Sequence, residues 1–129
     1  MSDEAEMRSL AEKVFGAVEA GDVATVRSLY ADDCRIWHNT DDLEQTAEEN
    51  LAVLSGLTKR LADRVYSQRR LEVFPGGFVQ QHVLRGVLAD GTSFAMPACI
   101  ICRVRDGRIV RIDEYVDSAR VAEFRRLAA

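Results

Sequence analysis

The sequence predicts an α+β fold, with helices in the first half of the chain and a meander of antiparallel strands in the second. Two observations carry this prediction. Apolar residues recur with helical spacing before residue 61, and Gly-containing turns separate runs rich in Val, Ile and Phe after it. The chain has 129 residues, 47% of them hydrophobic, which is the size and balance of one core. We therefore expect a single domain over residues 1–129.

The first predicted helix starts near a capping box formed by Asp3 and Glu6 and stops at Gly21. Its apolar stripe has the spacing of an amphipathic helix and consists of Met7, Leu10, Ala11, Val14, Phe15 and Val18.

Two shorter helices and one strand follow. Asp22 caps the second helix, which the pair Asp32–Asp33 is expected to end, and residues 34–38 read as a short strand. Thr46 and Glu49 form a capping box that opens the third helix. The apolar side of that helix is predicted to carry Leu51, Leu54 and Leu61.

Three turns divide the second half into strands, and a last helix follows Asp117. The turns are Pro75-Gly76-Gly77, Asp90-Gly91 and Asp106-Gly107. Each Asp-Gly turn fits either a two-residue loop or a three-residue loop, and the choice decides which residues share a face. At the last turn, a two-residue loop pairs Ile100 with Asp113 and scatters charge over both faces.

A three-residue loop at 105–107 instead gives one face that is apolar except for Glu114. It places Cys102, Ile100, Ala98 and Met96 opposite Val110, Ile112, Glu114 and Val116. The same loop type at 89–91 pairs Leu84 with Met96, His82 with Ala98 and Gln80 with Ile100. A two-residue turn at 76–77 sets Leu71 opposite His82 and Val73 opposite Gln80. The predicted row across the sheet is Leu71, His82, Ala98 and Glu114.

Alternation in the strand at 34–38 turns His38 inward together with Cys34 and Ile36. Both histidines of the chain are then expected to face one interior. The opposite, half-apolar face is predicted to be buried in a homodimer and to carry Val83, Cys99, Ile101, Ile109 and Tyr115.

Composition narrows the classes of partner. Seventeen Lys and Arg against twenty-one Asp and Glu leave a net charge of −4, which does not favour nucleic-acid binding. The start MSDEAEMRSL does not read as a secretory signal, so we expect a cytoplasmic protein with reduced thiols. The longest apolar run, residues 98–102, is far below the roughly 20 residues that span a bilayer, so we expect no membrane partner.

No cofactor is expected. Cys99 and Cys102 form a C-x-x-C, but residues three apart in a strand point to opposite faces and cannot chelate one metal. Two histidines and one acid are not spaced as a metal site. Gly76-Gly77 lies between strands and not between a strand and a helix, so it does not read as a phosphate-binding loop.

Two stretches resemble a known family. VEAGDVATVRSLYADDCRIWHN and the closing DGRIVRIDEYVD, followed by a final helix, are similar to the nuclear transport factor 2-like superfamily. This superfamily includes ketosteroid isomerases, SnoaL-type cyclases, limonene epoxide hydrolases and scytalone dehydratase. The resemblance implies a cone-shaped α+β barrel, in which a curved sheet wraps N-terminal helices around an apolar pocket, often as a dimer through the outer sheet face.

Residue by residue, the resemblance is partial. The catalytic carboxylate of the isomerases falls on His38, and their oxyanion-binding Tyr falls on Val14. A catalytic Asp of the epoxide hydrolases falls on Glu114, while their Arg and second Asp fall on Gln81 and Val83. That ungapped match turns Gln81 and Val83 inward, against the hairpin register, unless a strand bulge intervenes. Scytalone dehydratase, with pocket histidines and an Asp, is the nearest chemical analogy.

These observations predict an acid–base site. Two imidazoles and a carboxylate in apolar surroundings can remove a proton beside a carbonyl and return it elsewhere. The expected catalytic residues are His38, His82 and Glu114, and the expected substrate-binding residues are Trp37, Asn39, Asp41, Gln80 and Met96. The alternatives are a non-catalytic site for an apolar ligand, a dimeric interaction domain, and a structural role for Glu114 paired with Arg69 or Arg85.

Overall fold

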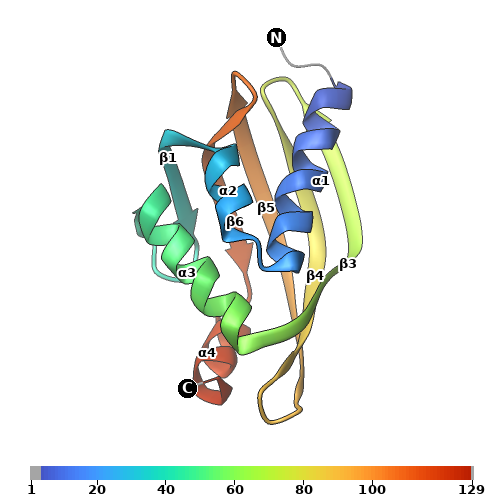
Figure 1. Ribbon diagram of the computed structural model, residues 1–129, viewed down its shortest axis with the longest axis vertical. Helices are drawn as coiled ribbons and strands as arrows, with labels where there is room; N and C mark the ends of the chain where they lie inside the picture. Colours follow the sequence, from blue (N-terminus) through green and yellow to red (C-terminus); the bar gives the residue numbers. More distant parts are fainter. Residues whose placement is uncertain (1–3, 129) are drawn as a thin grey trace.

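Helices α1 to α3 lie against one face of a six-stranded sheet in the computed structural model, which describes residues 4–128 (Figure 1). The helices are α1 (Glu4–Ala20), α2 (Val23–Leu29), α3 (Ala47–Arg60) and α4 (Ser118–Leu127). The strands are β1 (Tyr30–His38), β2 (Glu44–Thr46), β3 (Leu61–Phe74), β4 (Gly77–Leu88), β5 (Ser93–Arg105) and β6 (Arg108–Val116). The expected α+β class, with N-terminal helices against a mostly antiparallel sheet, is confirmed.

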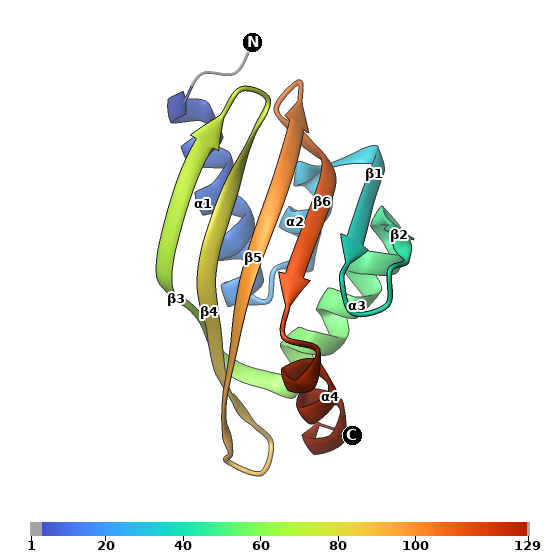
Figure 2. The ribbon, with the colours of Figure 1, turned by 180° about the vertical axis from the view of Figure 1, so that it is seen from behind.

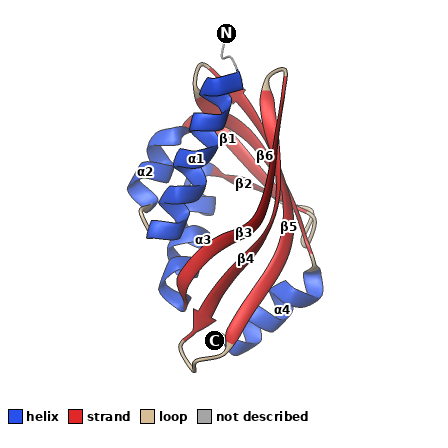
Figure 3. Cartoon of the chain, turned by 90° about the vertical axis from the view of Figure 1, so that its right-hand side faces the viewer, coloured by secondary structure: helices blue, strands red, loops and turns tan. Residues whose placement is uncertain are grey.

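The strand order across the sheet is β2-β1-β6-β5-β4-β3. β1 runs parallel to β6, whereas all other neighbours are antiparallel. The sheet has two edges and is therefore open, not a closed barrel. It bends around the helices, and α4 lies at its lower end (Figure 3). The opposite face of β3 to β6 is uncovered (Figure 2).

Local capping signals place the helix starts as expected. The side chain of Asp22 accepts a hydrogen bond from the backbone of Thr25 at the start of α2. Thr46 and Glu49 form the reciprocal capping box that opens α3. The predicted capping role of Asp3 falls outside the described residues.

Two helix ends differ from the prediction. α2 ends at Leu29, and Asp32 and Asp33 lie inside β1, where the pairing with β6 shifts register. That irregularity lets two consecutive acidic residues both face solvent, which a regular strand does not allow. Leu61 belongs to the start of β3 and not to α3, and its side chain is fully buried there.

The β4–β5 hairpin has the predicted register. Leu84 pairs with Met96, His82 with Ala98 and Gln80 with Ile100. Gln81 is exposed on the opposite face, so the hairpin register holds and the inward placement of Gln81 and Val83 is wrong.

The β5–β6 hairpin has a different loop. Arg105 pairs with Arg108, so the turn contains only Asp106 and Gly107, both at positive φ (52° and 78°), as a tight hairpin turn requires. A bulge at Val110 then moves the register one residue further.

These two changes together shift the β5–β6 pairing by two residues from the prediction. Cys102 lies opposite Ile112, Ile100 opposite Glu114 and Ala98 opposite Val116. A shift of two keeps every side chain beyond the bulge on its predicted face, because strand side chains alternate with a period of two. Ile109 precedes the bulge and is buried in the core, so its placement on the outer face was wrong.

The β3–β4 hairpin is also shifted by two residues at its turn. Phe74 pairs with Gly77, which makes the loop Pro75-Gly76 instead of Gly76-Gly77. Leu71 therefore lies opposite Gln80 and not opposite His82. Further along, a second irregularity sets Gln68 and Arg69 together against the single residue His82.

Candidate functional site

A cavity of about 430 Å³ lies between the inner face of the sheet and the helices. Its volume is in the range of small-molecule sites, and most of its wall is apolar. His38, His82 and Glu114 all line it, as strand alternation predicted. The cavity therefore brings both histidines of the chain and the Glu114 carboxylate against a single space.

His38 and Glu114 form a close pair because their strands are adjacent and in parallel register. His38 ends β1 and is directly opposite Glu114 in β6. The His38 Nε2 and Glu114 Oε1 atoms are 2.8 Å apart, and the two side chains are 18% and 21% exposed. Glu114 thus pairs with His38 and not with Arg69 or Arg85, which bind other partners.

The pair favours a protonated imidazole. Burial by itself would lower the pKa of His38, but the hydrogen bond and negative charge of Glu114, helped by Asp41, outweigh it and raise that pKa above its usual value of 6.5. The arrangement therefore places an imidazole and a carboxylate in hydrogen-bonding contact at the cavity wall, where they can share a proton.

His82 has a different environment, deep in the sheet. Its residue is only 4% exposed, and its ring meets the rings of Tyr66 and Phe15 edge-on, at centroid distances of 4.6 and 5.7 Å. Its Nδ1 atom lies 2.9 Å from the side-chain nitrogen of Gln80. Burial lowers the pKa of His82 to about 4, and the charge of Arg69 acts in the same direction against that of Glu114. His82 is neutral near pH 7.

The prediction that Glu114 lies next to His82 was wrong. The expected row placed Glu114 beside Ala98 and His82, but the two-residue shift puts Val116 in that place. Glu114 instead lies one step along the strand, opposite Ile100, where it reaches His38 from the neighbouring strand.

The five expected substrate-binding residues separate into two groups. Met96 and Asp41 line the cavity, Asp41 at an exposed position. Gln80 is fully buried beside His82 and is not part of the cavity wall. Asn39 bonds both backbone groups of Val116 through its side chain, which joins the ends of β1 and β6.

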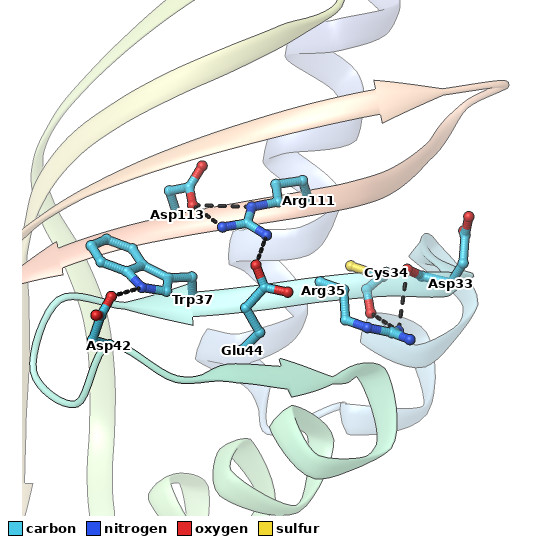
Figure 4. Close-up of polar contacts among 8 residues, drawn as sticks. All are labelled: Asp33, Cys34, Arg35, Trp37, Asp42, Glu44, Arg111 and Asp113. Carbon is cyan, nitrogen blue, oxygen red and sulfur yellow. Dashed lines mark hydrogen bonds and ion pairs between the residues drawn. The ribbon is translucent and has the colours of Figure 1, made fainter.

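Trp37 of β1 does not line the cavity, and its indole lies beside Asp42 (Figure 4). Its indole nitrogen donates to Asp42 at 2.7 Å, and its ring contacts Tyr115. In the same region, Arg111 bonds both Asp113 and Glu44 and so ties β6 to β2 across β1 (Figure 4).

Sequence reasoning missed a chain of amide and hydroxyl groups on the cavity wall. The Tyr30 hydroxyl donates to Asn50 at 2.9 Å, and Asn50 donates to Gln45 at 3.1 Å. All three residues line the cavity, and so does Tyr66. The available signal was Asn50, a polar residue beside Leu51 on the apolar side of the predicted third helix.

The cysteines of the C-x-x-C face opposite sides of the sheet, as alternation predicted. Cys102 is buried and lines the cavity, whereas Cys99 lines a groove on the outer face. Within residues 4–128, no group of three His, Cys, Asp or Glu side chains is arranged to hold a metal ion. No helix in that range is long and apolar enough to cross a membrane.

Comparison with known proteins identifies the family. The model of the SnoaL-like domain matches residues 11–112. The chain belongs to the SnoaL-like domain family. The resemblance to the nuclear transport factor 2-like superfamily is thereby confirmed.

Solved structures with the same fold as this SnoaL-like domain include three with enzymatic names. A candidate isomerase from Bacillus subtilis has 12% identity and a TM-score of 0.81, with 98% of this chain and 96% of that chain covered. A candidate polyketide cyclase from Xanthomonas campestris has 17% identity and a TM-score of 0.81, covering 99% and 100%. An LEH-like epoxide hydrolase of M. tuberculosis has 16% identity and a TM-score of 0.75, with 93% of this chain and 89% of that chain covered. No curated protein matches the chain in sequence.

Proposed function

We propose that this SnoaL-like domain is a cofactor-independent acid–base enzyme that acts on an apolar carbonyl or hydroxy compound. The reaction is of the isomerase, dehydratase or cyclase type. The observation that carries this proposal is the His38–Glu114 pair, 2.8 Å apart, at the wall of a mainly apolar cavity of about 430 Å³. The enzymatic names of several structural neighbours are consistent with it.

The proposed chemistry is transfer of a proton between carbon atoms. The Glu114 carboxylate removes a proton from the carbon next to the carbonyl, and the electron pair of the broken C–H bond passes into the carbonyl group to form an enolate. His38, whose pKa is raised, supplies the proton that returns to carbon. His82 lies on the same cavity wall, and Met96 and Asp41 are the proposed substrate contacts.

Deuterium exchange tests this proposal without knowledge of the natural substrate. α-Tetralone, an apolar bicyclic ketone, is incubated with the protein in heavy water, and incorporation beside the carbonyl is followed by NMR. We expect exchange above the rate without protein, and a loss of at least about tenfold in Glu114→Gln and in His82→Ala. Asp113→Asn is the matched control, because Asp113 is the adjacent carboxylate of β6 and bonds Arg111 outside the cavity.

The competing function is non-catalytic binding of an apolar ligand in the same cavity. Calorimetric titration with α-tetralone separates the two. A binder keeps its affinity in Glu114→Gln and shows no exchange in any variant, whereas an acid–base enzyme keeps binding and loses turnover. Binding without exchange would therefore overturn the catalytic proposal.

We also propose a homodimer through the uncovered face of the sheet. Val65 and Tyr115 are 50% and 47% exposed there, and an open groove of about 830 Å³ lies beside Val83, Cys99 and Tyr115. Exposed apolar side chains gathered on one uncovered sheet face favour an interface there.

A further inference from the structure

A line of hydrogen bonds connects the protein surface to His82. Glu12 of α1 accepts two hydrogen bonds from the guanidinium of Arg69, at 2.6 and 3.1 Å. The Nε atom of Arg69 donates to the side-chain oxygen of Gln80 at 3.0 Å. The side-chain nitrogen of Gln80 contacts His82 Nδ1 at 2.9 Å. We call these residues, Glu12, Arg69, Gln80 and His82, the relay.

The chemistry of arginine fixes the direction of every bond in the relay. A guanidinium has only donors, so the Gln80 atom that faces Arg69 must be the amide oxygen. The NH₂ group of Gln80 then faces His82 and can only donate, so His82 Nδ1 must accept. An imidazole that accepts at Nδ1 and is neutral carries its proton on Nε2.

We infer that Gln80, oriented by Arg69 and Glu12, is a positioning residue that holds His82 as the neutral Nε2–H tautomer, so that His82 acts as a hydrogen-bond donor and not as a base. Within residues 4–128, no group bonds to the Nε2 atom of His82, although the ring lines the cavity. That N–H is therefore available to a bound molecule.

The backbone of β3 is built for this arrangement. Gln68, at φ 53°, and Arg69 together oppose the single residue His82. This bulge turns both Tyr66 and Arg69 to the inner face, although they are three residues apart. Tyr66 then contacts the His82 ring while Arg69 reaches Gln80. Gln80 is fully buried, and burial strengthens the requirement that each of its polar atoms keeps a partner.

The inference rests on the proposed function for its catalytic consequence. When Glu114 removes the proton beside a carbonyl, negative charge develops on the carbonyl oxygen. A fixed N–H at the wall of a mainly apolar cavity, within reach of that oxygen, stabilises it more than the uncharged ground state. The proton on His82 stays in place throughout, and the proton that moves is exchanged between carbon and the His38–Glu114 pair. In this site the His38–Glu114 pair transfers the proton, and His82 is a separate hydrogen-bond donor to the carbonyl oxygen. The site therefore favours substrates with a carbonyl group.

Nitrogen NMR of isotope-labelled protein tests the relay without any substrate. At neutral pH, we expect His82 to show an unprotonated Nδ1 and a protonated Nε2. Gln80→Glu replaces the donor with a carboxylate that accepts from Nδ1, so the two nitrogen signals should exchange their character. Arg69→Met frees the Gln80 amide to rotate and should give a mixture of tautomers. Gln81→Glu is the matched control, since Gln81 is the adjacent glutamine of β4 and is exposed.

The inference that the relay sets the tautomer of His82 would be overturned by wild-type His82 protonated at Nδ1. An unchanged tautomer in Gln80→Glu and Arg69→Met would overturn it as well. These spectra do not depend on catalysis, so they stand apart from any failure of the proposed function. In the α-tetralone exchange assay, we expect Gln80→Glu to lower the turnover rate at least about tenfold with little change in affinity. Unchanged turnover, with the tautomer reversed, would overturn the role of His82 as donor.

Discussion

His82 couples the stability of the protein to pH because it is buried in its neutral form. Its pKa is about 4 in the folded protein and 6.5 in the reference state. Between these values the unfolded chain binds a proton that the folded chain does not, so stability is lost as pH falls through this window. His38 acts in the opposite direction, since its raised pKa contributes stability that is present at low pH and lost as pH rises.

The variant His82→Gln should remove this pH dependence. Between about pH 7 and about pH 4, we expect wild type to lose about 3 kcal/mol more stability than the variant, from the difference between the two pKa values of His82. Urea unfolding of both proteins at several pH values measures this difference in the free energy of unfolding. The carboxylates and His38 are present in both proteins, so their effects cancel. Parallel pH profiles would contradict the assignment of a neutral, buried His82.

The residues of the candidate site were predictable as a set, but their contacts were not. Alternation along β1, β4 and β6 predicted that His38, His82 and Glu114 share one face, and an error of two residues in register leaves that face unchanged. The identity of neighbours does depend on register, which is why Glu114 was assigned to the row of His82. Gln80 was expected to contact substrate because it faces inward. Only the position of Arg69 shows that the Gln80 side chain is oriented toward His82.

At the level of elements, α3 depends on a capping box that also shapes the cavity wall. Thr46 and Glu49 satisfy each other's backbone N–H groups, and Asn50 follows directly with its bond to Tyr30. Thr46→Ala should cost about 1 kcal/mol of stability, because a free helix N–H loses its acceptor. Urea unfolding checks this value. Thr46→Ser retains the hydroxyl and should be nearly neutral; an equal loss in both variants would show that the hydroxyl does not matter.

Two adjacent glycines at the β3–β4 turn, Gly76 and Gly77, should differ in how much replacement by Ala destabilises the fold. A Cβ atom on Gly77 would collide with the backbone carbonyl of Cys102 and come within 2.8 Å of the Phe74 ring. Gly77→Ala should therefore destabilise by about 3 kcal/mol, the upper part of the range for overpacking. Gly76→Ala meets nothing within 4 Å, and only its φ of +89° opposes it, so we expect about 1 kcal/mol. Thermal or urea unfolding ranks the two, and the reverse order would contradict the turn geometry.

The helix caps and the β4–β5 turn were predictable because their signals are local, whereas the loops of the other two hairpins differ from the prediction. Asp22, Thr46 and Glu49 act within one helical turn, and the β4–β5 loop takes its register from residues 89–91 alone. The bulges were not predictable. Val110 and Gln68 are residue types with no special turn preference, and the bulges depend on how the sheet must bend around the helices.

For the whole molecule, the main prediction concerns assembly. Light scattering at micromolar concentration should give twice the mass of the chain, because the uncovered sheet face is partly apolar. Tyr115→Arg places a charge on that face and should yield a monomer. Leu43→Arg is the control, since Leu43 is 63% exposed on the β1–β2 loop. A monomeric wild type would remove the proposal.

The two cysteines of β5 lie on opposite faces of the sheet, so their reactivity reports the accessibility of each face. Cys99 faces the outer groove, whereas Cys102 faces the cavity with a thiol whose pKa is raised well above its usual value by burial. In the monomeric variant Tyr115→Arg, a thiol-specific reagent should label Cys99 from the outside and reach the buried Cys34 and Cys102 only when the fold opens. The rate at which the buried thiols are labelled then measures how often the site unfolds locally. A ligand bound in the cavity should lower that rate.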